Sequence, residues 1–215
     1  KQIRIGAPDG PIAPLVVNLS YGNFAGPHYG TSLIARMLDR ELVSTPEQEI
    51  RVLLPAGNSN MAQAHAAVSF ENADAVSLDL NVMPDDLSSN YVQMWMPYAP
   101  ATPPDFVQVR VTPPHAPQSM VVQAIAGSKQ VLHDAQGNVV AELGYSFEPM
   151  PTARGVITLA VNPTASHDPA VHLAPSGRWT IELTKGVIDP DDIVEVRIKR
   201  DERLPGYPNG ARQSY

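Results

Sequence analysis

Two short segments that follow apolar runs carry the side chains best suited to chemistry. Asn58 closes the run 51–58, Arg-Val-Leu-Leu-Pro-Ala-Gly-Asn, and the run that begins at Ala13 ends in Ser20–Gly22. A strand that leads directly into a Gly-Asn turn aims its last side chain beyond the edge of the sheet. A carboxamide there is a short, neutral hydrogen-bond donor, suited to an oxygen atom that gains negative charge during a reaction.

The elements around these segments indicate a small α/β unit. Leu15 to Leu19 and Val52 to Leu54 are short continuous apolar runs, typical of parallel strands buried on both faces. Between them, residues 32–42 have apolar side chains at helical spacing, and Thr31 or Ser32 can cap the helix. A right-handed strand–helix–strand crossover is expected. Because two strands and one helix cannot bury both faces of a sheet, we expect the chain to be a segment cut from a longer protein.

Asn-Leu-Ser-Tyr-Gly, a helix, and a β-run ending in Ala-Gly-Asn together resemble the middle of subtilisin-like serine peptidases, over less than a third of the chain. The resemblance implies that Asn58 is the side-chain donor of the oxyanion hole. It also implies a groove strand that pairs with a polypeptide substrate and a segment that lines the specificity pocket. Pro55 departs from the small residue usual at its position. The implied substrate-binding residues are Ser20, Tyr21, Gly22, Pro55, Ala56 and Gly57.

The catalytic triad of that family is not recognisable in the chain. The family's Asp and His precede the oxyanion Asn, but Asp9 lies in a predicted loop with no His motif after it. The nucleophilic Ser follows the Asn in the family. Gly30-Thr31-Ser32 copies the start of the nucleophile motif but precedes Asn58, and we interpret it as a helix cap. The triad is therefore expected in the remainder of a longer peptidase domain, and this segment alone should be inactive.

From about residue 70 the sequence alternates between apolar and polar residues with period two, which predicts strands separated by turns. Asp134–Asn138 is a predicted hairpin loop with Gly at the tight position. The spacing indicates an antiparallel β-sandwich, which would be an insertion after Asn58. The predicted strands are 75–82, 91–96, 106–111, 120–126, 129–133, 139–143, 156–161, 179–183 and 194–199.

The predicted organisation is an α/β fragment at 1–67, a β-sandwich at 68–203, and a linker at 204–215 that returns to the peptidase domain. A further helix is expected over Ser59 to Ala67. Gly177–Leu183 resembles a late strand of the jelly-roll domains attached to subtilisin-like convertases. Because Trp179 alternates with Ile181 and Leu183, it is expected to be a core residue rather than a ligand platform.

Composition argues against several functions. The chain of 215 residues has no Cys, which excludes disulfides, thiolate zinc sites and a cysteine nucleophile. Its net charge of −7 argues against binding nucleic acid or an anionic membrane. No apolar run approaches the roughly 18 residues of a membrane span. By family analogy alone, a secreted or extracytoplasmic location is expected.

Weaker candidates have ordinary structural explanations. His65, and the group His167, Asp168 and His172, are interpreted as surface or loop residues rather than as a base or metal ligands. No cofactor is expected. Asp189–Asp192 could offer oxygen ligands to Ca²⁺, but an acidic turn explains the segment equally well.

Two alternatives to the peptidase hypothesis remain open at this point. One is a non-enzymatic sandwich that binds carbohydrate or protein, for which Tyr91, Trp95 and Tyr98 could supply a sugar-stacking face. The other is a pseudoenzyme that keeps the fold without the triad.

Overall fold

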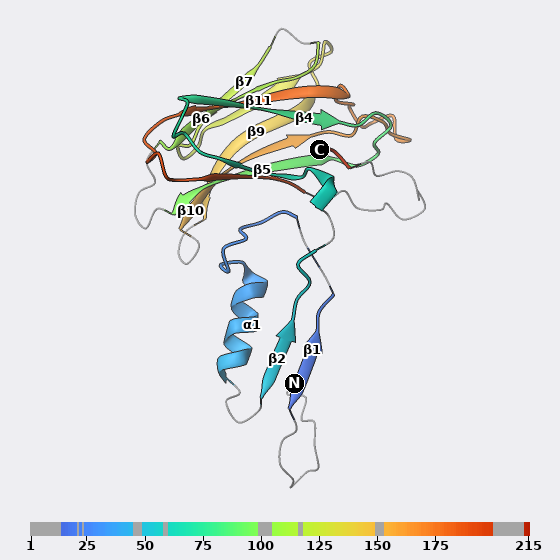
Figure 1. Cartoon of the computed structure of the whole chain (residues 1–215). Helices are drawn as coiled ribbons and strands as arrows, with labels where there is room; N and C mark the ends of the chain where they lie inside the picture. The colour runs from blue at the N-terminus through green and yellow to red at the C-terminus, as the bar shows by residue number, and fades with distance from the viewer. Residues whose placement is uncertain are drawn as a thin grey trace. The chain divides into compact units, whose positions relative to one another are not determined.

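The structure is a computed structural model that describes residues 14–20, 22, 24–44, 49–57, 60–98, 105–115, 118–148, 153–199 and 213–215. The chain forms two compact units. The first unit comprises Lys1–Asn23 and Pro27–Asn60, and the second comprises Phe24–Gly26 and Met61–Tyr215. Both units are drawn in Figure 1. No helix in the described ranges is long and apolar enough to cross a membrane.

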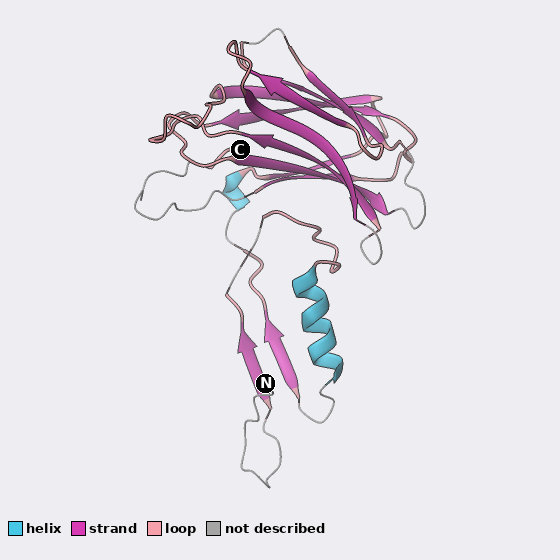
Figure 2. Ribbon diagram, turned by 180° about the vertical axis from the view of Figure 1, so that it is seen from behind, coloured by secondary structure: helices cyan, strands magenta, loops and turns pink. Residues whose placement is uncertain are grey.

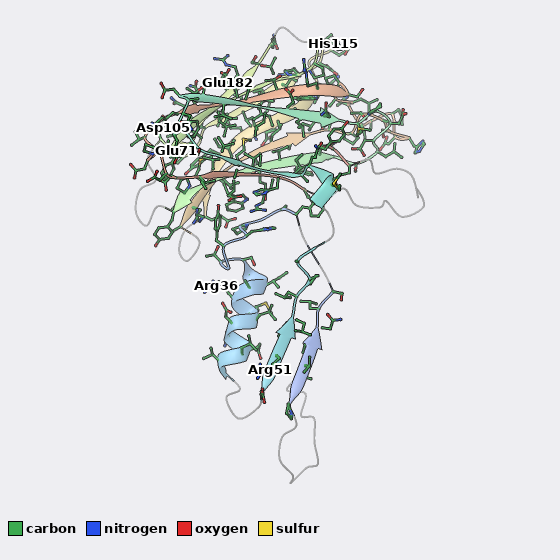
Figure 3. All side chains as sticks on the ribbon, viewed as in Figure 1. Arg36, Arg51, Glu71, Asp105, His115 and Glu182 are labelled. Atoms are coloured by element: carbon green, nitrogen blue, oxygen red, sulfur yellow. The ribbon has the colours of Figure 1, made fainter. Side chains whose placement is uncertain are left out.

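The first unit contains a parallel two-stranded sheet and one helix. Strand β1 (Leu15–Asn18) pairs with β2 (Ile50–Leu53), and helix α1 (Leu33–Ser44) lies between them in sequence (Figure 1). Strand β1 falls within the predicted run Leu15 to Leu19, whereas β2 begins at Ile50, two residues before the predicted run Val52 to Leu54. On β2, Arg51 donates from Nε to Glu49 Oε1 at 2.8 Å, and both of these side chains are exposed (Figure 3).

The first unit leaves much of its apolar surface exposed. Several large apolar side chains on the strands and on the helix are more than half exposed, including Val16 at 62%, Leu33 at 72% and Val43 at 80%. The same holds for Leu53 and Leu54 at the end of β2. The described part of this unit therefore does not cover the apolar faces of its own sheet and helix, in keeping with the small size of a two-stranded sheet.

The second unit is built from two antiparallel sheets, seen as two layers in Figure 2. The six-stranded sheet has the order β3-β12-β5-β10-β9-β8, and the four-stranded sheet has the order β4-β11-β6-β7. The predicted antiparallel, sandwich-like architecture is confirmed. The strands are β3 (His65–Val68), β4 (Ala75–Val82), β5 (Asn90–Tyr98), β6 (Val107–Thr112), β7 (Met120–Gln123), β8 (Lys129–His133), β9 (Val139–Glu148), β10 (Arg154–Val161), β11 (Gly177–Lys185) and β12 (Val194–Ile198).

The core lies between the two sheets and consists of every second residue of most strands. Trp179 on β11 is fully buried with Ile181 and Leu183, and its Nε1 donates to the carbonyl oxygen of Pro175 at 3.0 Å. The prediction that Trp179 is a core residue is thus confirmed. On the outer face of the four-stranded sheet, Glu182 Oε1 lies 3.7 Å from Arg110 Nε (Figure 3).

The predicted helix over Ser59 to Ala67 is wrong within the described residues. Only Asn60–Ala62 form a single 3₁₀ turn, after which Gln63 adopts a positive φ of 50°. The chain then enters β3, where His65 pairs with Arg197. Ser59 itself lies outside the described residues. Pairing with β12 overrides the helix propensity of an alanine-rich segment, and from Met61 onward the chain belongs to the second compact unit.

The predicted hairpin loop is confirmed, whereas the C-terminal residues differ from the prediction. The predicted hairpin loop at Asp134–Asn138 connects β8 to β9, with Gly137 at a φ of 87°. Of the predicted linker 204–215, only the last three residues are described. There, Tyr215 exchanges backbone hydrogen bonds with Asn81 of β4, at 2.7 and 3.4 Å. These last residues therefore belong to the sandwich unit.

Candidate functional site

The ends of β1 and β2 bring most of the predicted site residues to one edge of a sheet. The strands are parallel and in register from Leu15 opposite Ile50 to Asn18 opposite Leu53. The pairing continues one residue further, because the Leu19 N–H donates to the Leu53 carbonyl at 3.0 Å. Parallel strands end at the same edge, so the residues after β1 and those after β2 emerge there together.

All the described site residues at this edge are exposed. They are Ser20 and Gly22 after β1, and Pro55, Ala56 and Gly57 after β2. The Ser20 hydroxyl donates to Asn18 Oδ1 at 3.3 Å. The two remaining predicted residues, Tyr21 and Asn58, lie outside the described residues.

Gly57, the last described residue before Asn58, has a left-handed backbone conformation. Its φ of 91° lies in the left-handed region, which is accessible to Gly and costly for residues with a Cβ. The backbone at Gly57 therefore departs from the extended conformation of β2.

Ser32 caps helix α1. Its Oγ accepts a hydrogen bond of 3.2 Å from the Ala35 N–H, and its carbonyl accepts one of 3.0 Å from the Arg36 N–H. Gly30, two residues earlier, has a φ of 75° that turns the chain into the helix. The interpretation of Gly30-Thr31-Ser32 as a helix cap is confirmed, because the Ser32 hydroxyl oxygen accepts a hydrogen bond from a backbone N–H of the helix.

In the sandwich, His65 belongs to a charged cluster at the edge of the six-stranded sheet. Its Nε2 forms a short hydrogen bond with Glu195 Oε2, and Arg197 Nη2 donates to the same oxygen at 3.1 Å. The three residues share the outer face of the neighbouring strands β3 and β12. His65 is therefore a surface residue held by a carboxylate, as expected from the sequence.

Of the aromatic side chains considered for sugar stacking, Trp95 is buried, whereas Tyr98 is 52% exposed. Trp95 is only 1% exposed, and its Nε1 donates to Gln93 Oε1 at 3.3 Å. The same oxygen accepts a 2.7 Å hydrogen bond from the N–H of Gly26, in the short segment Phe24–Gly26 that belongs to this unit. Tyr91 faces the Lys199 ammonium, with Nζ 5.2 Å from its ring centroid. Trp95 thus has no free ring face to offer a sugar.

The candidate metal-binding loops adopt ordinary turns. Asp168 accepts a 2.9 Å hydrogen bond from the Ala170 N–H through its carboxylate, and the Asp192 N–H donates to the Asp189 carbonyl at 3.0 Å. In the part of the chain that the structure describes, no group of three or more His, Cys, Asp or Glu side chains is arranged to hold a metal ion.

The structure contains a buried polar cluster that the sequence pattern did not predict. Asp86, Asn90 and Ser214 are each at most 1% exposed, and they lie in the β4–β5 loop, at the start of β5 and at the C-terminal end. The Asn90 amide donates to Asp86 Oδ2 at 3.0 Å, and the Ser214 hydroxyl forms a short hydrogen bond with Asn90 Oδ1. The only local signal is the Asp-Asp-Leu-Ser-Ser-Asn run at 85–90, which is also typical of an exposed turn.

Comparisons with known proteins add little. No protein-family model matches the chain, and no curated protein matches it. Among solved structures, the D2-D3 domains of the flagellar cap protein FliD from Escherichia coli align with 7% identity over 63% of this chain and 94% of that chain, at a TM-score of 0.22. The D1-D2-D3 domains of the same protein align with 8% identity over 68% of this chain, at a TM-score of 0.23. This chain spans about half (55%) of that second structure. TM-scores this low carry no argument about fold or function.

Proposed function

We propose that this chain is a segment of a subtilisin-like serine endopeptidase that hydrolyses peptide bonds in a polypeptide substrate. The observation that supports this most is the parallel register of β1 and β2, with Asn18 opposite Leu53. Because of this register, Ser20–Gly22 and Pro55–Gly57 emerge at the same edge, and Asn58 follows directly. The proposal needs this arrangement, because the residues that pair with the substrate and the oxyanion donor must both lie next to the same scissile peptide bond.

In the proposed mechanism the chain binds the substrate and stabilises the transition state. The residues after β1, Ser20–Gly22, pair with the substrate backbone as an added strand. A Ser in the remainder of the peptidase domain attacks the scissile carbonyl carbon, and a His takes the Ser proton. The carbonyl oxygen becomes negative, and the Asn58 amide and a backbone N–H donate hydrogen bonds to it. The intermediate collapses to an acyl-enzyme, the amine leaves with the proton from His, and water then hydrolyses the ester.

The exposed apolar surface of the first unit is consistent with this proposal. Val16, Leu33 and Leu53 are each more than half exposed, although such side chains normally become buried when a sheet is complete. In the proposed enzyme, further strands and helices of the peptidase domain cover them. The sandwich is then an insertion that follows the oxyanion Asn.

The decisive experiment is to replace Asn58→Ala in the longer enzyme. In a subtilisin, removal of one oxyanion donor lowers kcat by about 10²–10³-fold, and we adopt that figure here. KM should change little, because the donor acts mainly in the transition state. An Asn58→Ala enzyme with normal turnover excludes Asn58 from the oxyanion hole.

Ser32→Ala is the matched control. It removes the helix cap, which costs about 1 kcal/mol of stability, and should leave kcat unchanged. If kcat is instead abolished while the protein stays folded, Ser32 is the nucleophile and the proposed order of catalytic residues is wrong.

The flanking gene sequence separates the proposal from its alternatives. The peptidase requires an Asp and a His encoded before Lys1 and a Gly-Thr-Ser turn encoded after Tyr215. A parent without them is a pseudoenzyme. Specific glycan binding by the isolated sandwich, together with a parent lacking the triad, establishes a non-enzymatic binding module.

A further inference from the structure

The sandwich has one incompletely covered side, because six strands face only four. Strand β3 is at the edge of the larger sheet and β4 is at the edge of the smaller one. Near these edges Ala66 and Leu78 point toward the core but are only partly buried. A slot of about 100 Å³ lies between the two edges, lined mainly by apolar side chains that include Leu80 and Val196, and Tyr215 also borders it. The smaller sheet therefore leaves Ala66 and Leu78 only partly covered at this side, while Leu80 and Val196 deeper in the slot are buried.

The free edge of β4 already carries one strand pairing. The Asn81 N–H donates to the Tyr215 carbonyl at 2.7 Å, and the Tyr215 N–H donates to the Asn81 carbonyl at 3.4 Å. Two residues that exchange both bonds form a hydrogen-bonded antiparallel pair. Tyr215 thus stands where the first residue of a fifth strand would stand.

The next backbone groups along this edge are available for pairing. The opposite edge of β4 is occupied by β11, where Leu80 lies opposite Trp179 and Leu78 opposite Ile181. Backbone groups alternate between the two edges of a strand, so Asp79 and Ser77 face the same side as Asn81. In the described part of the chain, no backbone partner occupies that side of Asp79 or Ser77.

The alternation also defines the side chains that such a strand needs. Directly opposed residues in an antiparallel pair point to the same face of the sheet. The first and third residues after Tyr215 would lie opposite Leu80 and Leu78 and point into the slot, so they should be apolar. The second would lie opposite Asp79, whose carboxylate is 3.6 Å from Arg178 on the outer face, and should be polar.

We propose that, in the longer enzyme, the polypeptide that follows Tyr215 runs antiparallel to β4 as a fifth strand of the smaller sheet. This strand uses the backbone groups of Asp79 and Ser77 and fills the slot with its alternate side chains. The inference rests on the proposed function only in requiring that the chain continue in a longer protein. Its physical basis is the Tyr215–Asn81 pairing, the free edge of β4 and the partly covered apolar slot.

Amide hydrogen exchange tests the proposal directly. In the longer enzyme, the amides of Asp79 and Ser77 should exchange at least about tenfold more slowly than in the chain ending at Tyr215, because a new strand protects them. The Leu78 amide, bonded to β11 in both proteins, is the internal control and should not change. Equal exchange of Asp79 and Ser77 in the two proteins overturns the proposal. If protection appears in the 215-residue chain and rises with its concentration, the partner is a second copy and the proposal is also wrong.

A matched pair of variants in the longer enzyme provides the second test. Asp79→Pro and Asp79→Ala both remove the carboxylate, but only Pro also removes the edge N–H. Asp79→Pro should therefore restore fast exchange at Ser77, and Asp79→Ala should not. Neither readout depends on catalysis. An inactive parent with a protected edge contradicts the peptidase proposal alone, and an active parent with an unprotected edge contradicts the strand proposal alone.

Discussion

The buried amide of Asn90 donates a hydrogen bond of 3.0 Å to the carboxylate of Asp86. The other Asp86 oxygen accepts a 2.9 Å hydrogen bond from the Ser88 N–H, and Asn90 also binds Ser214, 124 positions later in the chain. One small cluster therefore fixes the loop between β4 and β5 and holds the last residues of the chain against the sandwich.

Asp86→Ala should lower the free energy of unfolding by about 2–3 kcal/mol, because it leaves buried N–H donors without an acceptor. Urea unfolding followed by circular dichroism measures the change. Asp85→Asn is the control: Asp85 is exposed with a φ of 57°, a conformation that Asn tolerates. That control should differ from the original protein by less than about 0.5 kcal/mol. If the Asp86→Ala protein has the same free energy of unfolding as the original protein, the cluster does not stabilise the fold.

Gly186→Ala should destabilise the sandwich by about 1–3 kcal/mol, because the added methyl group meets rigid backbone. A Cβ at this position would overlap the carbonyl oxygens of Asp105 and Phe106. The overlap cannot be relieved easily, since the Gly186 N–H donates to the Phe106 carbonyl at 2.9 Å.

Gly144→Ala is the matched control for Gly186→Ala. Its added Cβ would meet the flexible side chain of Lys129 at an ordinary 3.9 Å. The variant should be neutral or more stable by up to about 1 kcal/mol, because Gly loses more backbone entropy on folding than Ala does. Equal thermal midpoints for the two variants would contradict the backbone-contact argument.

Tyr145→Phe should be neutral or slightly stabilising, by up to about 1 kcal/mol. The Tyr145 hydroxyl is buried without a hydrogen-bond partner among the described residues, and a buried, unpaired polar group costs free energy. A loss of more than about 2 kcal/mol in urea unfolding would reveal a hydrogen bond that stabilises the hydroxyl.

The stability of the same variant should also respond differently to alkaline pH. Burial raises the pKa of Tyr145 above its ordinary value of 10.0. Above about pH 10 the unfolded chain loses this proton first, so the folded state loses stability as pH rises. Tyr145→Phe removes that contribution. The stability difference between the two proteins should be constant below pH 9 and should shift in favour of the Phe variant above pH 10, which urea unfolding at several pH values can measure.

Asn138→Ala should raise the pKa of Asp134 toward its ordinary value. The side chain of Asn138 donates to the Asp134 carboxylate at 3.0 Å, and this hydrogen bond, followed by that from the Asn138 backbone, lowers the pKa of Asp134. Carboxyl chemical shifts in an NMR titration measure the change. Gln136→Ala keeps the backbone N–H that donates to Asp134, so this control should leave the pKa unchanged. A pKa unaffected by Asn138→Ala would assign the shift to the backbone.

Local chemistry was predictable where neighbouring residues decide the structure. The alternation of Trp179 with Ile181 and Leu183 was sufficient to predict a core strand, because successive strand residues point to opposite faces. Ser32 was recognised as a cap, because a hydroxyl before an apolar helical segment can bind the first free N–H groups.

Long-range pairing was not predictable from the same patterns. The alanine-rich segment before Val68 has the composition of a helix, yet it forms β3 because β12, about 130 residues later, supplies its partner. The sequence pattern placed Trp95 in a strand. Only the fold shows that the Trp95 ring is buried and that the Gly26 N–H binds the neighbouring Gln93 side chain.

For the candidate site, the sequence by itself determined that Asn58 and Ser20–Gly22 follow two apolar strands, with a helix between them. The pattern also predicted a parallel crossover, but the tertiary structure decided that the two strands are direct neighbours with Asn18 opposite Leu53, so that their ends share an edge. It also decided that the chain's last residue pairs with Asn81. The physical reason is that strand type follows from local side-chain patterns, whereas a strand's partner is chosen by hydrogen bonding and burial between segments far apart in sequence.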